Sequence, residues 1–127
     1  VHQYVCFVGV TPIQQALAAF MTRYPDYPST LADAYQARRD RLLARLASSR
    51  FGITPSKGTY FQLLDYSEIS DLDGATLATL WTRERGIATI PLEPFYAQAP
   101  RALRQLRLCF AKTDETLDEA ARLLCAI

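Results

Sequence analysis

The segment from Gln105 to Ala111 constrains the fold most, because its side chains alternate between the two faces of an extended strand. Leu106, Leu108 and Phe110 fall on one face, and a period of two is typical of a strand that is buried on one side. The other face carries Gln105, Arg107, Cys109 and Ala111. Such a strand needs neighbouring strands and a layer of helices over its apolar face.

Four helices are expected from apolar residues at helical spacing and from residues that favour helix ends. Thr11, Pro12 and Gln14 predict a hydroxyl cap and a capping box at the first helix start. The other helices are expected to begin near Ser29 or Thr30, at Asp71 or Asp73, and at Thr113. Gly86 is placed as the left-handed stop of the third helix, in which Leu77, Leu80 and Trp81 are expected to face inward.

Two further strands are expected besides the alternating segment. Residues 59–65 are rich in aromatic and apolar side chains, with Phe61 and Leu63 on one face. Residues 87–90 predict a shorter strand that Pro91 ends. The resulting order of helices and strands predicts an α+β fold, with a small, about three-stranded sheet and helices packed on it.

Length and charge exclude several classes of protein. The chain has 127 residues, which predicts one domain over residues 1–127. Fourteen Lys and Arg against thirteen Asp and Glu leave a formal charge of +1, unlike a dedicated nucleic-acid binder or a polybasic membrane anchor. No apolar run approaches the roughly 20 residues that span a bilayer. We therefore expect no nucleic-acid partner and no membrane partner.

The arginines of the second expected helix are its strongest charged feature. They are Arg38, Arg39, Arg41 and Arg45. No aromatic residues interleave with them as a nucleic-acid groove would need. We expect a solvated helix face with local ion pairs.

Cysteines and histidines give little support to a metal site or a nucleophile. Cys6, Cys109 and Cys125 form no CxxC pair, so neither a disulfide framework nor a zinc site is indicated. Cys109 and Cys125 are expected to be small buried hydrophobes, in a reducing and hence cytoplasmic compartment. His2 is the only histidine, and its place at the chain end makes it a poor candidate for a catalytic base.

Arg107 stands out because Leu106 and Leu108 flank it in an apolar strand. An arginine there must reach an acidic partner, solvent or the anion of a ligand. Its planar fork suits bidentate capture of a carboxylate. The alternative is an arginine on an edge strand whose head extends into water. Spacing alone leaves both interpretations open.

Several segments follow one another in an order that resembles an enzyme family. They are Gly58–Phe61, Asp65–Ser67 with Ile69–Asp71, Gly86–Leu92 with Phe95, and Leu106–Lys112. Together they resemble the C-terminal part of class I/II, fold type I aminotransferases, which use pyridoxal 5'-phosphate (PLP). The methionine/kynurenine (glutamine) aminotransferase branch is the most similar. The opening Val1–Tyr4, with Phe7, Thr11 and Gln14, resembles the stretch that follows shortly after the segment with that family's PLP-binding lysine.

The resemblance implies roles for particular residues. Arg107 matches the arginine that binds the substrate α-carboxylate, and Phe61 matches an aromatic residue near the coenzyme. Phe7 matches a loop position that approaches the neighbouring subunit's active site in the family's dimer. Residues 91–96 resemble a mobile stretch that borders the cleft. Residues 1–25 would be the connecting helix region from a large domain that precedes this small domain.

The coenzyme's own ligands are expected elsewhere. The family's Schiff-base lysine, the aspartate on the pyridine nitrogen and the phosphate-binding residues belong to parts that precede the matched stretch. Lys57 and Lys112 are the only lysines, and neither lies in the matching motif. We expect no catalytic, coenzyme-binding or metal-binding residue in this segment, no bound PLP, and no turnover by it alone.

The resemblance implies that the full-length parent is a cytoplasmic, homodimeric enzyme of amino acid metabolism. It would exchange an amino group between an amino acid and a 2-oxo acid. One alternative is a stand-alone α+β module that binds small carboxylates through Arg107 without catalysis, and another is a domain that serves as an interaction surface. An in-frame SxxK-type lysine motif upstream of Val1 would favour the enzyme.

Overall fold

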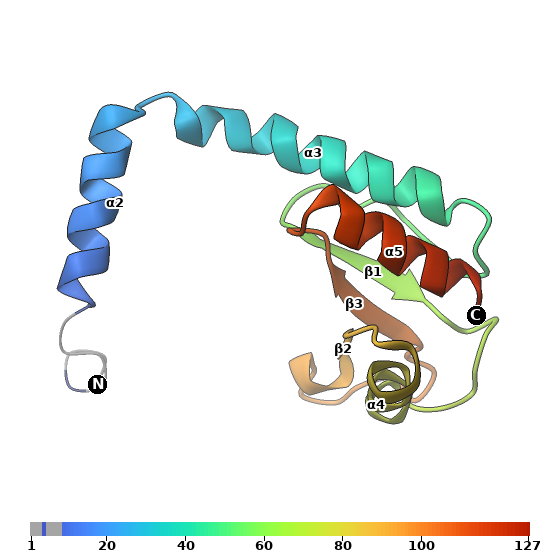
Figure 1. The fold of residues 1–127 in the computed structure, drawn as a ribbon. Coiled ribbons are helices and arrows are strands. Elements are labelled where there is room, and N and C mark those ends of the chain that lie inside the picture. The colour runs from blue at the N-terminus through green and yellow to red at the C-terminus, as the bar shows by residue number, and fades with distance from the viewer. Residues whose placement is uncertain (1–3, 5–8) are drawn as a thin grey trace. The chain divides into compact units, whose positions relative to one another are not determined.

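The computed structural model describes residue 4 and residues 9–127. These divide into two compact units, Val1–Ala34 and Tyr35–Ile127, and each is described by itself (Figure 1). His2, Cys6 and Phe7 lie outside the described residues. Within the described part of the chain, no helix combines the length and apolar character needed to cross a membrane.

The first unit contains α2 (Thr11–Arg23) and the start of α3 (Tyr27–Leu46). α2 ends before Pro25 because the residue preceding a proline avoids the helical region. The predicted capping box at Thr11 is wrong. Thr11 is already helical, Val10 occupies the N-cap, and no side chain caps the helix. α3 also begins earlier than predicted, at Tyr27, since Pro28 is tolerated in a first turn, where its missing N–H costs nothing.

The apolar side of α2 is exposed within this unit. Not one residue of α2 is buried, and Ile13, Leu17 and Met21 all expose about half or more of their surface. The Phe20 ring contacts Tyr27 edge-on, with 5.0 Å between ring centroids. The expectation that residues 1–25 connect to another domain stays a prediction.

The second unit is built on a three-stranded antiparallel sheet with the order β1-β3-β2. β1 is Phe61–Asp65, β2 is Ile90–Pro91 and β3 is Gln105–Cys109. Leu63 of β1 and Ile90 of β2 lie opposite Arg107 of β3 on its two sides. This arrangement confirms the predicted α+β fold with a small sheet.

All three strands are shorter than predicted. β3 ends at Cys109 rather than at Ala111, and Pro91 lies inside β2 instead of ending it. The late starts of β1 and β2 have local reasons. Thr59 has φ 65°, in the left-handed region, so the extended conformation begins only at Phe61. Ile87 follows the last residue of α4 (Gly74–Arg85) by two positions and bonds back to that helix instead of joining β2. Its N–H donates to the Trp81 carbonyl, and its carbonyl accepts from the Thr82 hydroxyl.

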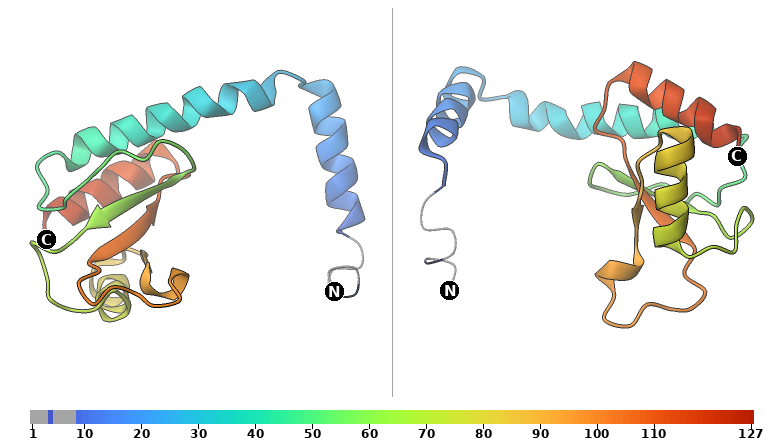
Figure 2. Two further views of the ribbon diagram at one scale, coloured as in Figure 1. Left: turned by 180° about the vertical axis from the view of Figure 1, so that it is seen from behind. Right: turned by 60° about the horizontal axis from the view of Figure 1, so that its bottom comes forward.

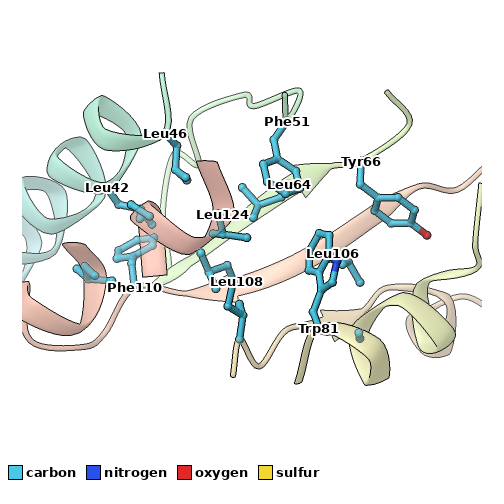
Figure 3. Packing of buried hydrophobic residues seen from close by; sticks show 14 of the residues in the cluster. Leu42, Leu46, Phe51, Leu64, Tyr66, Trp81, Leu106, Leu108, Phe110 and Leu124 are labelled. Carbon is cyan, nitrogen blue, oxygen red and sulfur yellow. The ribbon is translucent and has the colours of Figure 1, made fainter. Parts of the chain in front are cut away.

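Helices cover one face of this sheet. Leu64, Leu106 and Leu108 point to that face and are buried. Side chains from α3, α4 and α5 (Asp114–Cys125) pack on them in a single cluster (Figure 3). The view from behind in Figure 2 shows β1 and β3 in front of α4 and α5. The helices contribute Leu42, Leu46, Leu77, Trp81, Leu117, Ala121 and Leu124 to the core.

The predicted ends of α4 and α5 are confirmed. The Asp73 carboxylate accepts from Thr76 N–H at 2.9 Å, and Gly86 closes α4 in the left-handed region at φ 69°. The Thr113 hydroxyl accepts from Thr116 N–H at the start of α5. These caps satisfy backbone groups that a helix end leaves free.

Two burial predictions are wrong. Leu80 is 37% exposed, because the buried stripe of α4 runs through Leu77 and Trp81 and leaves Leu80 at its border. Cys125 is exposed and Cys109 is only partly buried. Cys125 is the last residue of α5, where its thiol donates to the Arg45 carbonyl at 3.4 Å.

The arginines of α3 form ion pairs, as predicted, but mostly with α5. Arg41 contacts Asp114 at 3.0 Å and Asp118 at 2.7 Å, and Arg45 contacts Asp118 at 3.3 Å. The hydrogen bond from Arg41 lowers the pKa of Asp118. Exposed pairs of this kind contribute little stability each, and they leave the arginines engaged within the protein.

Substituting the same residue type on the two faces of the sheet tests this architecture. Leu106→Ala should lower the free energy of unfolding by about 2–5 kcal/mol, because it empties a fully buried core position. Leu63→Ala is the matched control on the outer face and should cost well under half as much. Urea unfolding of the 127-residue chain followed by Trp81 fluorescence measures both, and equal losses would contradict the assignment of faces.

Candidate functional site

The outer face of the sheet is left open by the helices. Burial alternates along β1 and β3, so that Leu64 and Leu106 point inward while Leu63 and Arg107 point outward. Leu63 is 39% exposed and Ile90 is 43% exposed. An apolar row interrupted by one cation therefore crosses the open face.

The Arg107 guanidinium lies against two aromatic rings. Its central carbon is 4.0 Å from the ring centroid of Phe61 and 5.0 Å from that of Phe95. Both distances are within the range of cation–π attraction. Phe61 comes from β1 and Phe95 from the short helix η1 (Glu93–Phe95), which follows β2. The structure thus brings two sequence-predicted site residues, Arg107 and Phe61, together.

Arg107 lacks an acidic partner among the residues that the structure describes. All the ion pairs found there lie within α3, within α5 or between these two helices. The Nε of Arg107 is buried and makes no hydrogen bond within the same set of residues. The rings contact the guanidinium without neutralising its charge, so its N–H groups remain to bind an anion.

Two carboxylates near this face are engaged elsewhere. Asp65 Oδ1 accepts from the Ser67 N–H at 2.9 Å and from the Ser67 hydroxyl at 2.6 Å. These bonds lower the pKa of Asp65 and hold its carboxylate in its own turn. Glu93 Oε1 accepts from the Gly74 N–H at 2.8 Å. Neither carboxylate neutralises Arg107.

The position of β3 bears on the two interpretations of Arg107 left open by spacing. β3 is the central strand of the sheet, so the alternative is wrong in placing Arg107 on an edge strand. The carboxylate role of Arg107 stays a prediction. A partly buried arginine on a central strand, without an internal acid among the described residues, is suited to bind an anion from outside this unit.

A buried amide holds the strand that carries Phe61. Gln62 is fully buried, and its Nε2 donates to the carbonyls of Thr54 and Leu63 at 2.8 and 2.9 Å. Its Oε1 accepts from the Ser56 N–H at 3.1 Å. Since each bond satisfies a buried polar group, the loop before β1 is tied to the strand.

Two contributors to the site were missed by sequence reasoning: the amide of Gln62 and the carboxylate of Glu93. The resemblance included Phe95 and placed residues 91–96 at the border of the cleft. It did not predict the contact of the Phe95 ring with Arg107, because this irregular segment has no periodicity. The signal for Gln62 was a polar residue on the apolar face of a strand, because such a group must find partners.

The two lysines of the chain lie in a loop and beside α5. Lys57 is exposed in the loop before β1. Lys112 lines a groove of about 520 Å³ along α5, whose lining includes none of Arg107, Phe61 and Phe95. A search of the described part of the chain finds no group of His, Cys, Asp or Glu that could hold a metal ion.

Comparison with known proteins identifies relatives over almost the whole chain. Residues 1–124 match the family model described as aminotransferase class I and II. The chain is 44% identical to methionine aminotransferase of Escherichia coli over 98% of its length and 32% of the relative's. It is 33% identical to a kynurenine–oxoglutarate transaminase of Dictyostelium discoideum over 94% of its length and 32% of the relative's.

Solved structures agree with these matches. The crystal structure of the E. coli methionine aminotransferase superposes with a TM-score of 0.85 at 43% identity and covers all of this chain, which spans 33% of it. That of an N-succinyldiaminopimelate aminotransferase from Mycobacterium tuberculosis gives 0.83 at 34% identity, over 98% of this chain and 32% of the other. The chain spans about a third of the length of the relatives it matches.

The lowered pKa of Asp65 gives a test of the outer face by pH. Its native pKa lies below the unfolded value of about 3.9, so the stabilisation is present above pH 4 and is lost as pH falls through the native pKa. Ser67→Ala should move the pKa of Asp65 back toward 3.9, as measured by carboxyl NMR titration. Ser29→Ala is the control, and an unmoved Asp65 pKa in Ser67→Ala would show that the Ser67 hydroxyl does not hold the carboxylate; the backbone N–H at position 67 remains in this variant.

Proposed function

This chain belongs to the aminotransferase class I and II family, and from that membership we propose that it is the C-terminal substrate-binding part of a PLP-dependent aminotransferase. The full-length parent exchanges an amino group between an amino acid and a 2-oxo acid. The observation that carries the proposal is the Arg107 guanidinium, which lies against the Phe61 and Phe95 rings without an acidic partner among the described residues.

Arg107 binds the α-carboxylate that both substrates share. An amino acid and a 2-oxo acid differ at Cα and carry the same carboxylate, so one guanidinium serves both halves of the exchange. The two N–H groups of its edge match the two oxygens of a carboxylate. Phe61 and Phe95 shield the flat faces from water, which strengthens the ion pair.

The open face selects the substrate side chain. Leu63 and Ile90 flank Arg107 on the neighbouring strands, and Phe95 adds an exposed ring. These groups favour a sizeable apolar, sulfur-containing or aromatic side chain. The names of the methionine and kynurenine relatives support that choice.

Coenzyme chemistry is supplied by the parent outside this chain. Members of the family use PLP, whereas the described residues here do not form a site for it. The division makes this chain a recognition unit that turns over no substrate by itself. We place the parent in the cytoplasm as a homodimer, with Phe7 near the neighbouring subunit's active site.

Replacing Arg107 in the full-length parent tests the carboxylate role. Arg107→Leu should raise KM strongly and cost about 2–5 kcal/mol in kcat/KM, because the carboxylate loses its charged partner in a desolvated site. Arg85→Leu, an exposed position on α4, is the matched control and should leave the kinetics unchanged. An unchanged kcat/KM in Arg107→Leu would remove Arg107 from the site.

Mixing the 127-residue chain with PLP tests the proposal that the coenzyme is held by other parts of the parent. No single lysine should form a stable, stoichiometric adduct, because Lys57 and Lys112 are exposed and should react with PLP only as ordinary surface amines. Borohydride reduction followed by peptide mass spectrometry measures this directly. A stoichiometric adduct at one of these lysines, abolished by its replacement with Arg, would contradict the proposal that the chain holds no coenzyme.

A further inference from the structure

We propose that Glu93 is the positioning residue that keeps Phe95 over the Arg107 guanidinium. It does so by fixing η1 to the first residue of α4. Its importance for substrate binding rests on the proposed function of Arg107, whereas the geometric effect on Arg107 does not.

The first step is the contact between Glu93 and the start of α4. Glu93 Oε1 accepts from the Gly74 N–H at 2.8 Å, and Gly74 is the first residue of that helix. The N–H groups of a first turn have no partner inside the helix, and their positive end attracts a carboxylate. The Asp73 carboxylate accepts from the Thr76 N–H, so each of the two carboxylates binds one N–H group of the first turn of α4.

The second step is the space that Gly74 leaves for this carboxylate. A Cβ at position 74 would lie 2.6 and 2.7 Å from the two carboxylate oxygens of Glu93, closer than such atoms approach. Glu93 Oε2 is buried and has no hydrogen-bond partner among the described residues. The carboxylate therefore depends on the Gly74 N–H, and without that bond water would be its better environment.

The third step is the short link from Glu93 to Phe95. Both belong to the single turn of η1, which the Phe95 N–H closes on the Leu92 carbonyl at 3.0 Å and the Tyr96 N–H closes on the Glu93 carbonyl at 3.1 Å. Phe95 is 61% exposed, so core packing does not place its ring. The turn places it, and Glu93 is the member of that turn bonded to α4.

The consequence for Arg107 follows from the geometry. Phe61 is held by the sheet, so its ring stays against the guanidinium. The Phe95 ring stays there only while η1 keeps its place. Releasing Glu93 should leave Arg107 with one aromatic wall, more water and a less defined N–H edge.

Arginine side-chain NMR of the 15N-labelled 127-residue chain tests this without substrate or coenzyme. Rings stacked on a guanidinium shift its Hε resonance upfield, and Arg107→Lys identifies that resonance by its loss. Phe95→Ala should move the signal downfield and sets the size of the Phe95 effect. Glu93→Ala should produce the same shift and remove the nuclear Overhauser effects between the Phe95 ring and Arg107.

Two more variants separate positioning from a general loss of structure. Glu93→Gln keeps an acceptor for the Gly74 N–H and should retain the upfield signal. Gly74→Ala raises helix propensity yet displaces the carboxylate, so it should reproduce Glu93→Ala while backbone amide signals of the core stay unchanged. Glu119→Ala on α5 is the matched control and should leave Arg107 unaffected.

The proposal is overturned if Glu93→Ala and Gly74→Ala leave the Arg107 Hε signal where it is in the unsubstituted 127-residue chain while Phe95→Ala moves it. It is also overturned if Phe95→Ala leaves the signal in place, because Phe95 would then not cover Arg107. Either result leaves the carboxylate role of Arg107 untouched, since no carboxylate is present. A failure of Arg107→Leu to alter kinetics in the parent would refute the proposed function and leave the NMR result standing.

Discussion

Burial of Leu106 and Leu108 under the helices is the constraint on which the rest of this unit depends. Side chains of a strand alternate, so burying these two forces Arg107, which lies between them, onto the opposite face. The antiparallel register then sets Leu63 and Ile90 beside it. A shift of the strand register by one residue would bury Arg107 and expose the two leucines. Burial of the leucines in the core therefore fixes the face on which Arg107 lies.

No carboxylate among the described residues neutralises the charge of Arg107. Asp65 is held by Ser67, and Glu93 is held by Gly74, so the two carboxylates of this region are engaged elsewhere. Two rings lower the polarity around the guanidinium without neutralising it. A cation kept in this state binds an incoming carboxylate more strongly than a solvated one does, because less water has to be removed.

Recognition and coenzyme chemistry are separable in the function that we propose. The chain spans about a third of the length of its relatives, yet its second unit contains a buried core and the carboxylate clamp that we propose. The clamp draws on β1, β3 and η1, which are far apart in the sequence. Its construction from one folded unit explains how substrate binding can be built independently of the residues that hold PLP.

The sequence by itself determined the kind and order of the helices and strands, both ends of α4 and the start of α5. Asp73, Gly86 and Thr113 act through bonds to residues a few positions away, and the alternation around Arg107 is a local pattern. The resemblance then attached a role to Arg107. Tertiary structure alone decided that β3 is the central strand, that Phe95 covers Arg107, and that Glu93 reaches Gly74. Those contacts join segments separated by 12 or more residues, and no local period or cap encodes which distant side chains meet.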